Sequence, residues 1–534
     1  MRYIPRLLKP RQLLEKCDGI AFLLLILPVI VACQPSIFDP QEPASSAVAP
    51  TGIPAPNVSP SPTSALASVT PTTENVTEKI VLVVPARWGE AAAQAIEDLT
   101  NTGTLYEWYV EVVDDNQENL PAEAHLSLSP DSSGIPAGER PIVMVVPFAS
   151  EWGGLSLEEA QELIQQNSPF VVGIDWDDMS PTFSALPVAG QLPGDSLYPL
   201  QQPWSISAPE SLEAAASDIA TAIRPYIELD NVVHLAAVGD IMLDRALGDS
   251  LRSGDIDYLF APIGDTLITP DYTIGNLESA MGETGQRESK GYTFQAPPEA
   301  AEALGRAGFD ILTLANNHAM DFGVDGLLEA IDIIEANGMV SVGAGIDANE
   351  ARRAAVLSRN NVNIAILAYV DVPIEFRGFD ARVWEAGPDK AGVAWADPVD
   401  IQEDVSAALK DSDVVVVLLH SGYEYIERPS PPQMNAAHAA IDAGASLVIG
   451  HHSHVLQPVE FYQDGVIVYG LANFAFEDAG PPETIILNVW IDEDGVRSIG
   501  ITPIIITPDG RPRLANDAEG LQILKSFYAL SVEP

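Results

Sequence analysis

The chain has 534 residues, too many for one core, and its hydrophobic share of 47% lets most of it fold into two or three domains. Its 26 Lys and Arg residues against 76 Asp and Glu residues give a formal net charge of −50, which argues against nucleic acid or an anionic membrane surface as the main ligand. The two cysteines, Cys17 and Cys33, are too few for a disulfide framework or a cysteine zinc site.

The first segment has the pattern of a secretory signal. Five basic residues lie within residues 1–19, and an apolar run over residues 20–32 follows them. This run is shorter than the ~20 residues of a spanning helix, and Pro28 interrupts it. Its ending, Ile30-Val31-Ala32-Cys33, resembles a bacterial lipobox, so we predict lipidation at Cys33, with an uncleaved membrane anchor as the alternative. Both alternatives place the rest of the chain on the extracytoplasmic face of the bacterial cell membrane.

Residues 34–78 are rich in Pro, Ser, Thr and Ala and lack a hydrophobic period, which predicts a disordered linker after the signal peptide of residues 1–33. Two folded regions follow, over residues 79–230 and 231–534. In the first, the predicted strands are Ile80–Val84, Pro141–Val146 and Phe170–Ile174, and the predicted helices are Gly89–Leu99 and Leu157–Ile164. This alternation indicates a smaller α/β domain, whose function the sequence does not reveal.

The same alternation is stronger after Asn231 and again predicts an α/β fold. The predicted strands are Val232–Val238, Tyr272–Gly275, Ile311–Ala315, Ile364–Tyr369, Val414–Leu419, Leu447–Ile449, Val466–Tyr469 and Thr484–Trp490. The predicted helices are Glu299–Ala307, Gly326–Ala336, Ile401–Lys410 and Gln433–Ala443.

Polar residues gather directly after these strands, where open α/β sheets bind ligands. Five of the eight histidines lie at such positions, a concentration that packing does not explain. Imidazole and carboxylate oxygen are ligands for Zn, Mn or Fe, so we predict one or two divalent transition metal ions. The predicted ligands are Asp240, Glu278, Asn317, His420, His452 and His454.

His318 adjoins a predicted ligand, and we predict it as the general acid, with Asp240 the second catalytic residue. Taken singly, Gly-Asp after a strand is often a turn, and Asn-Asn-His can cap a helix. The run Gly450-His451-His452-Ser453-His454 is more specific, because a strand or a tight turn can direct two of its rings to one side. Whether His451 or His452 is the ligand stays open.

The order of these motifs resembles the CapA family, a poly-γ-glutamate capsule family within the calcineurin-like metallophosphoesterase superfold. The resemblance spans residues 232–476, and the run from Asn316 to Asp321 is its most specific part. It implies a four-layer α/β/β/α sandwich with a metal site at the strand ends. It also implies a role in making, exporting, anchoring or trimming poly-γ-glutamate or a related anionic cell-surface polymer, with capsule synthesis or export proteins as further partners.

The chain departs from metallophosphoesterases at Met242, where these enzymes usually carry a histidine ligand; CapA proteins share this loss. Glu278 also stands where phosphoesterases use aspartate. Three functions therefore remain open: a metal-dependent hydrolase or transferase acting on an amide of a polymer, a phosphoesterase on a lipid-linked or nucleotide substrate, and a non-catalytic polymer-binding component. Arg245, Lys290 and Tyr292 are predicted substrate contacts, with surface charge pairing as the alternative for the basic residues.

Overall fold

A computed structural model describes residues 78–103, 106–114, 125–150, 154–194, 197–229, 231–375, 377–477 and 480–532. The predicted signal, Cys33 and residues 34–77 of the predicted linker lie outside these residues, and Glu78, its predicted last residue, begins the first strand. No helix within the described ranges combines the length and the apolar character needed to cross a bilayer.

The first folded region is a seven-stranded sheet with helices, in the strand order β2-β1-β3-β7-β4-β5 and with β6 paired to β4. Alternate residues of β1, among them Ile80 and Leu82, pack with α1 and α3 in one core, and Met144 of β4 belongs to a second core. The elements are β1 (Glu78–Pro85), α1 (Gly89–Thr102), β2 (Tyr106–Val113), β3 (Leu126–Ser129), β4 (Ile135–Pro147), α2 (Leu157–Gln165), β5 (Val172–Asp175), β6 (Phe183–Ala185), β7 (Gln201–Ser207) and α3 (Glu213–Ile227).

Two larger sheets make up the region after Asn231. One has the order β13-β12-β9-β8-β23-β24-β25, with β22 beside β8, and the other has the order β15-β16-β18-β19-β21-β20. Strands β8, β9, β12 and β13 are mutually parallel, as are β16, β18, β19 and β21. The strands are β8 (Val233–Ile241), β9 (Tyr272–Leu277), β10 (Ala280–Met281), β11 (Gln295–Ala296), β12 (Ile311–Thr313), β13 (Val340–Val342), β14 (Ala344–Gly345), β15 (Ala355–Arg359), β16 (Val362–Asp371), β17 (Gly392–Val393), β18 (Val414–Ser421), β19 (Leu447–His451), β20 (Val459–Tyr462), β21 (Gly465–Val468), β22 (Asn473–Ala475), β23 (Glu483–Asp492), β24 (Gly495–Ile506) and β25 (Pro512–Leu514).

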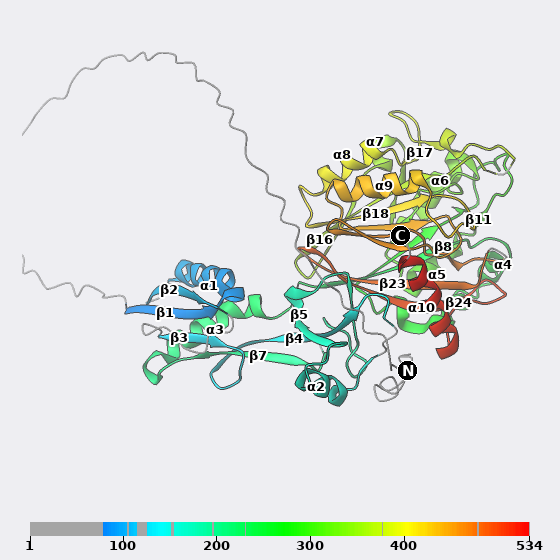
Figure 1. Ribbon diagram of the computed structural model, residues 1–534. Coiled ribbons are helices and arrows are strands. Elements are labelled where there is room, and N and C mark those ends of the chain that lie inside the picture. Colours follow the sequence, from blue (N-terminus) through cyan, green and yellow to red (C-terminus); the bar gives the residue numbers. More distant parts are fainter. Residues whose placement is uncertain are drawn as a thin grey trace, which may run out of the picture. The chain divides into compact units, whose positions relative to one another are not determined.

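The helices cover the outer sides of these two sheets. On β16, Ile364 and Ile366 join the core shared with the other sheet, whereas Ala365 and Leu367 face the core formed with α8 and α9. Burial on both faces explains why this strand is a continuous apolar run. Figure 1 shows α8 and α9 on one side of β16 and β18, and α10 on the opposite side, next to β24. The helices are α4 (Arg245–Arg252), α5 (Glu299–Ala307), α6 (Gly323–Ala336), α7 (Ala348–Ala351), α8 (Pro398–Ala408), α9 (Pro431–Asp442) and α10 (Asp517–Val532).

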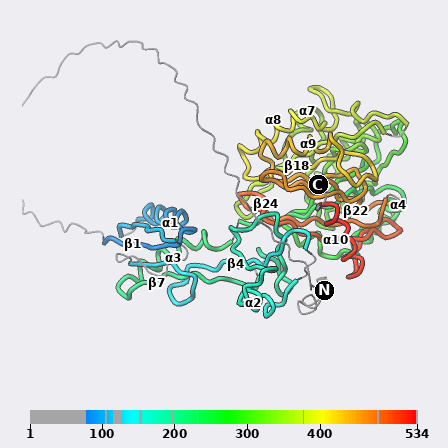
Figure 2. The backbone as a smooth tube through the Cα atoms, viewed as in Figure 1, coloured from blue at the N-terminus to red at the C-terminus, as the bar shows by residue number. Residues whose placement is uncertain are grey.

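The predicted α/β class is confirmed, with two stacked sheets and covering helices. The late strand β22 pairs with β8, the first strand of this region, and places Asn473 opposite Asp240. Figure 2 shows β22 among the segments formed after residue 231. No ladder joins the sheet of β1–β7 to the sheets formed after residue 231 within the described ranges. The two regions do contact each other, since the Trp176 indole donates to Asp492 Oδ2 over 3.0 Å.

Candidate metal centre

The parallel strands bring the predicted ligands to one edge of the sandwich. Asp240 lies at the end of β8, and Glu278 follows β9. His420 lies near the end of β18, next in its sheet to β19, which ends at His451. Carboxyl ends of parallel strands share an edge, so residues far apart in sequence meet there. All six predicted ligands and His318 are buried.

Close backbone contacts fix the ends of two of these strands. A Cβ atom on Gly450 would lie 1.9 Å from the Tyr469 carbonyl oxygen, and one on Gly239 would lie 2.1 Å from that of Ala472. Only glycine permits these approaches. After β19 the chain turns, and His452 and His454 have positive φ values of 80° and 52°. The two histidines therefore lie in a bend just after the strand and not within it, and they carry the backbone strain often found at functional sites.

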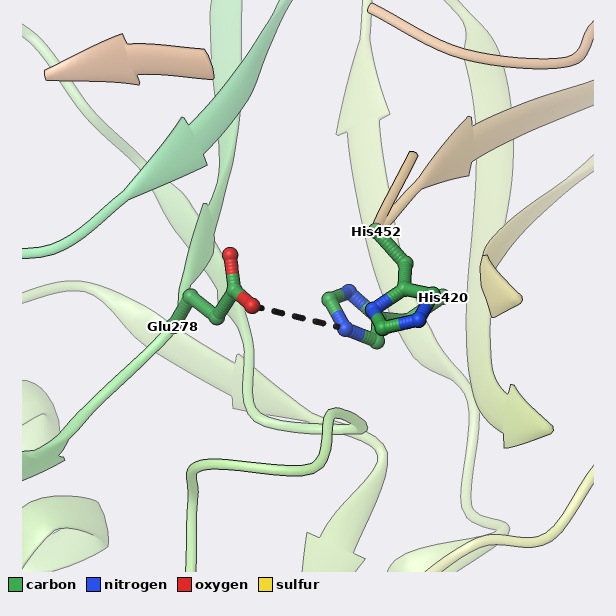
Figure 3. Close-up of side chains that lie close together, drawn as sticks. All are labelled: Glu278, His420 and His452. Atoms are coloured by element: carbon green, nitrogen blue, oxygen red, sulfur yellow. Dashed lines mark ion pairs between the residues drawn. The ribbon is translucent and has the colours of Figure 1, made fainter. Parts of the chain in front are cut away.

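Two groups of potential ligands share Glu278. Ligand atoms of Glu278, His420 and His452 lie within 4.8 Å of one another, and so do those of Asp240, Glu278 and His454. Figure 3 shows the first group, with Glu278 Oε1 facing His420 Nε2 at 3.8 Å. Two ligands bonded at about 2.1 Å to a tetrahedral ion are about 3.4 Å apart, so these separations suit a cation between them.

Further contacts surround the shared carboxylate. His454 Nε2 lies 3.8 Å from Glu278 Oε1, and its Nδ1 lies 3.3 Å from Asp240 Oδ2. The Asn317 Oδ1 atom is 2.8 Å from His420 Nε2 and so lies beside the same ring nitrogen that faces Glu278. These contacts bring all six predicted ligands into one cluster.

His451 has a different environment. Its Nε2 atom lies 3.1 Å from the Val238 carbonyl oxygen, and neither group of potential ligands contains it. The backbone N–H of His452 instead donates to Asp240 Oδ2 over 3.1 Å. On geometry, His452 is the better candidate ligand of the two.

The buried donors fit a divalent cation. Glu278 Oε2 and His452 Nδ1 have no hydrogen-bond partner among the described residues, which is costly for buried polar atoms. Burial, followed by the neighbouring Asp240, raises the pKa of Glu278 well above its ordinary value. A cation between these groups would relieve both penalties, because it supplies the missing partner and favours the charged carboxylate.

Burial acts differently on the histidines. It lowers the pKa of His420 well below its ordinary value and that of His452 to about 3, with repulsion between imidazoles adding to it. Both are therefore neutral at pH 7, the form in which histidine binds metals. Burial alone would also lower the pKa of His454, but Glu278 and Asp240 raise it to about 10. Burial would raise the pKa of Asp240, and the hydrogen bond from His454 and the other imidazoles hold it below its ordinary value.

His318 lies at the border of the cluster. Its Nε2 atom is 4.0 Å from Glu278 Oε1, while its Nδ1 lies 2.7 Å from Asp321 Oδ2. The Phe294 ring packs against the imidazole with centroids 4.5 Å apart. Asp321 thus fixes Nδ1 on the side away from the cluster, and Nε2 faces the cluster, an arrangement that suits a general acid.

The predicted substrate contacts lie in three different environments. Tyr292 is 62% exposed. Arg245 has a positive φ of 55° and its guanidinium lies 5.0 Å from the centre of the Phe294 ring, which in turn contacts His318. The Lys290 side chain is 0% exposed and is paired with carboxylates. Burial of this kind does not favour a direct substrate contact for Lys290.

Several residues of the site had no predicted role. Asn276 donates to Asp240 Oδ1 over 2.8 Å and lies 3.1 Å from His420 Nδ1. Its position two residues before Glu278 could have indicated it. Asn473 Oδ1 lies 2.8 Å from His454 Nδ1, and Glu375 Oε1 accepts from Asn317 Nδ2 over 3.1 Å. No pattern in the sequence points to Glu375.

The fold and the cluster together define an α/β sandwich protein with a candidate centre for divalent cations at its strand ends. The chain belongs to the family described as "Bacterial capsule synthesis protein PGA_cap", whose family model matches residues 234–478. The predicted family resemblance is therefore confirmed. Met242 occupies the position at which metallophosphoesterases usually carry a histidine. It is fully buried and packs with Phe294 and Phe476.

The PGA biosynthesis protein CapA of Bacillus subtilis (strain 168) is 32% identical over 282 residues, 52% of this chain and 72% of that protein. The capsule biosynthesis protein CapA of Bacillus anthracis is 30% identical over 309 residues, 56% of this chain and 73% of that protein. Among solved structures, a hypothetical protein from Thermus thermophilus is 15% identical over 51% of this chain and 98% of its own, with a TM-score of 0.32.

Proposed function

We propose that this protein is a cell-envelope member of the CapA family that acts on poly-γ-glutamate or a related anionic polymer, in its synthesis, export, anchoring or trimming. We further propose that it does so with a metal-dependent hydrolase-type site. The observation that carries the second proposal is the position of Glu278 in both groups of buried potential ligands. Two groups sharing one carboxylate suit a pair of cations.

When bound, such cations polarise a scissile carbonyl and activate water for attack. The residues of the chain supply the rest. Asp321 holds His318 by its Nδ1 atom, so Nε2 is directed toward the site. In its doubly protonated form the ring can donate the Nε2 proton to the leaving amine and return to the neutral form with its proton on Nδ1. The strongly acidic chain as a whole repels an anionic polymer, so a local basic group is needed to bind it. Arg245 supplies such a group, because its guanidinium beside the Phe294 ring can pair with a carboxylate of the polymer.

The proposed location rests on the N-terminal segment. Its basic flank, apolar run and lipobox-like ending support lipidation of Cys33 and a place on the outer face of the membrane. A Cys33→Ser variant should lose incorporation of radiolabelled palmitate and leave the membrane fraction. Equal labelling of the variant and the wild type would refute lipidation at this residue.

The function is tested with the full-length chain extracted in detergent and supplied with Mn²⁺, Zn²⁺ or Fe²⁺. We expect one to two ions per chain by elemental analysis, and release of glutamate oligomers from poly-γ-glutamate. A generic phosphodiester should be a far poorer substrate, because Met242 replaces a ligand histidine. Faster phosphodiester cleavage would favour a phosphoesterase, and polymer binding without turnover would favour a non-catalytic component.

A further inference from the structure

Lys290 is the one proposed substrate contact whose side chain is fully enclosed by the fold. It lies between β10 and β11, and its side chain is 0% exposed. The rings of Phe379 and Trp384 lie 5.4 and 4.9 Å from its Nζ atom. An ammonium group is rarely buried without charge partners.

Three oxygen atoms of the chain surround the Lys290 ammonium. Its Nζ atom lies 3.0 Å from Asp321 Oδ1 and 3.0 Å from Glu375 Oε1, and it donates to the Asn317 carbonyl oxygen. An ammonium has three N–H donors and no acceptor. One N–H donates to the Asn317 carbonyl and the charge is paired with two carboxylates, so the ammonium is directed into the protein and away from a substrate.

Both carboxylates lead from Lys290 to the candidate site. Asp321 uses its second oxygen to hold His318 Nδ1 at 2.7 Å. Glu375 accepts from Asn317 Nδ2 over 3.1 Å, and Asn317 Oδ1 lies at the metal cluster beside His420. Lys290 is thus the junction of two arms, one reaching the proposed general acid and the other a proposed ligand.

We propose that Lys290 is a positioning residue that fixes His318 and Asn317 relative to each other through Asp321 and Glu375, and that it does not contact the substrate. The proposal rests on the function proposed above for these two residues. Partners behind the ligands of metal sites commonly set ligand orientation, and their loss costs 10- to 100-fold in metal affinity or activity. A purely structural role would instead affect only the stability of the fold.

Affinity for Mn²⁺ tests the Asn317 arm without any need for turnover. In the full-length chain, Lys290→Met should weaken Mn²⁺ binding about 10- to 100-fold. Lys390→Met is the matched control, since the exposed Lys390 ammonium donates to the Val383 and Glu385 carbonyls, and it should leave the affinity unchanged. Wild-type affinity in a folded Lys290→Met variant would overturn the proposal.

A second variant guards against simple misfolding. Lys290→Met leaves the buried Asp321 and the partly buried Glu375 carboxylates without their cation, whereas the triple variant Lys290→Met/Asp321→Asn/Glu375→Gln contains no unpaired charge there. The triple variant should regain thermal stability but keep the weakened Mn²⁺ affinity, because amides cannot replace the link that the ammonium provides. Recovery of both properties together would show a structural role and overturn the proposal.

Nuclear magnetic resonance of the metal-free chain tests the His318 arm. With ¹⁵N-labelled histidine, and His318 assigned by its disappearance in His318→Gln, the wild type should show one fixed tautomer with the proton on Nδ1. Lys290→Met should give an exchange-averaged or shifted signal, and an unchanged signal would overturn the proposal even if no ion is bound. Absence of polymer cleavage by the wild type would refute the proposed function while leaving both of these readouts valid.

Discussion

Replacing Glu278 with glutamine is expected to abolish stoichiometric binding of divalent cations. Glu278 is the one residue common to both groups of potential ligands within the described residues, so a single substitution removes a charged ligand from both. An amide cannot bridge two cations as a carboxylate does, and we expect at least a 100-fold loss of affinity, about 2.7 kcal/mol. Elemental analysis after equilibrium dialysis against Mn²⁺ measures it directly.

Glu424→Gln is the control for this substitution. Glu424 is a nearby carboxylate that influences Glu278 but belongs to neither group, so its loss should leave the metal content near the wild-type value. Metal content in Glu278→Gln equal to that of the control would refute the assignment of this residue as the shared ligand.

The same substitution should also stabilise the metal-free protein. Burial and Asp240 raise the pKa of Glu278 well above its ordinary value, so the folded metal-free chain holds a proton there that the unfolded chain releases. This contribution to stability is complete below the unfolded pKa of about 4.3 and is lost as the pH rises through the folded pKa. At pH 7 the Glu278 carboxyl therefore destabilises the metal-free fold, and a neutral amide at this position would not. A lower melting temperature of the metal-free variant than of the metal-free wild type would contradict this explanation.

His318→Gln should slow hydrolysis of the polymer by about 10² to 10⁴-fold while leaving the metal content unchanged, because a general acid commonly contributes this much. His318 belongs to neither group of potential ligands, and its Nδ1 is held by Asp321, so glutamine removes the proton donor without removing a ligand. We expect the loss in kcat rather than in KM. Steady-state kinetics on poly-γ-glutamate together with metal analysis separate the two effects.

His438→Gln provides the matched control for His318. His438 lies on α9, where its ring stacks on Tyr462 and is hydrogen-bonded to Glu460. Its substitution should have no effect on kcat. If His318→Gln retained full activity, or lost its metal in parallel with its activity, His318 would not be the general acid.

The strongly patterned elements could be predicted from the sequence. Helix α5 has the predicted bounds Glu299–Ala307, and the buried strands β16 and β18 follow their apolar runs. The short pair β10 and β11 was missed, because two-residue strands have no period to detect. Helix α10 was also missed, although its Ile523 and Phe527 complete the main core.

The site followed a similar division. Ligand candidates could be found because each follows an apolar strand, and Asp240, Glu278 and the three histidines do converge. Glu375 could not be found, because its relation to Asn317 spans 58 positions and exists only after folding. The enclosure of the Lys290 side chain could not be predicted for a related reason: nothing in a sequence distinguishes an exposed lysine from one that lies beside Phe379 and Trp384.

The candidate centre draws its side chains from both halves of the sandwich. Asp240 and Glu278 come from the sheet of β8 and β9, whereas His420 and His452 come from the sheet of β18 and β19. The distances between ligands from different sheets therefore depend on how the two sheets pack on the apolar side chains between them. A substitution in the core between the sheets, at a position such as Ile366 or Val416, can change these distances and so the activity, although neither residue contacts a ligand.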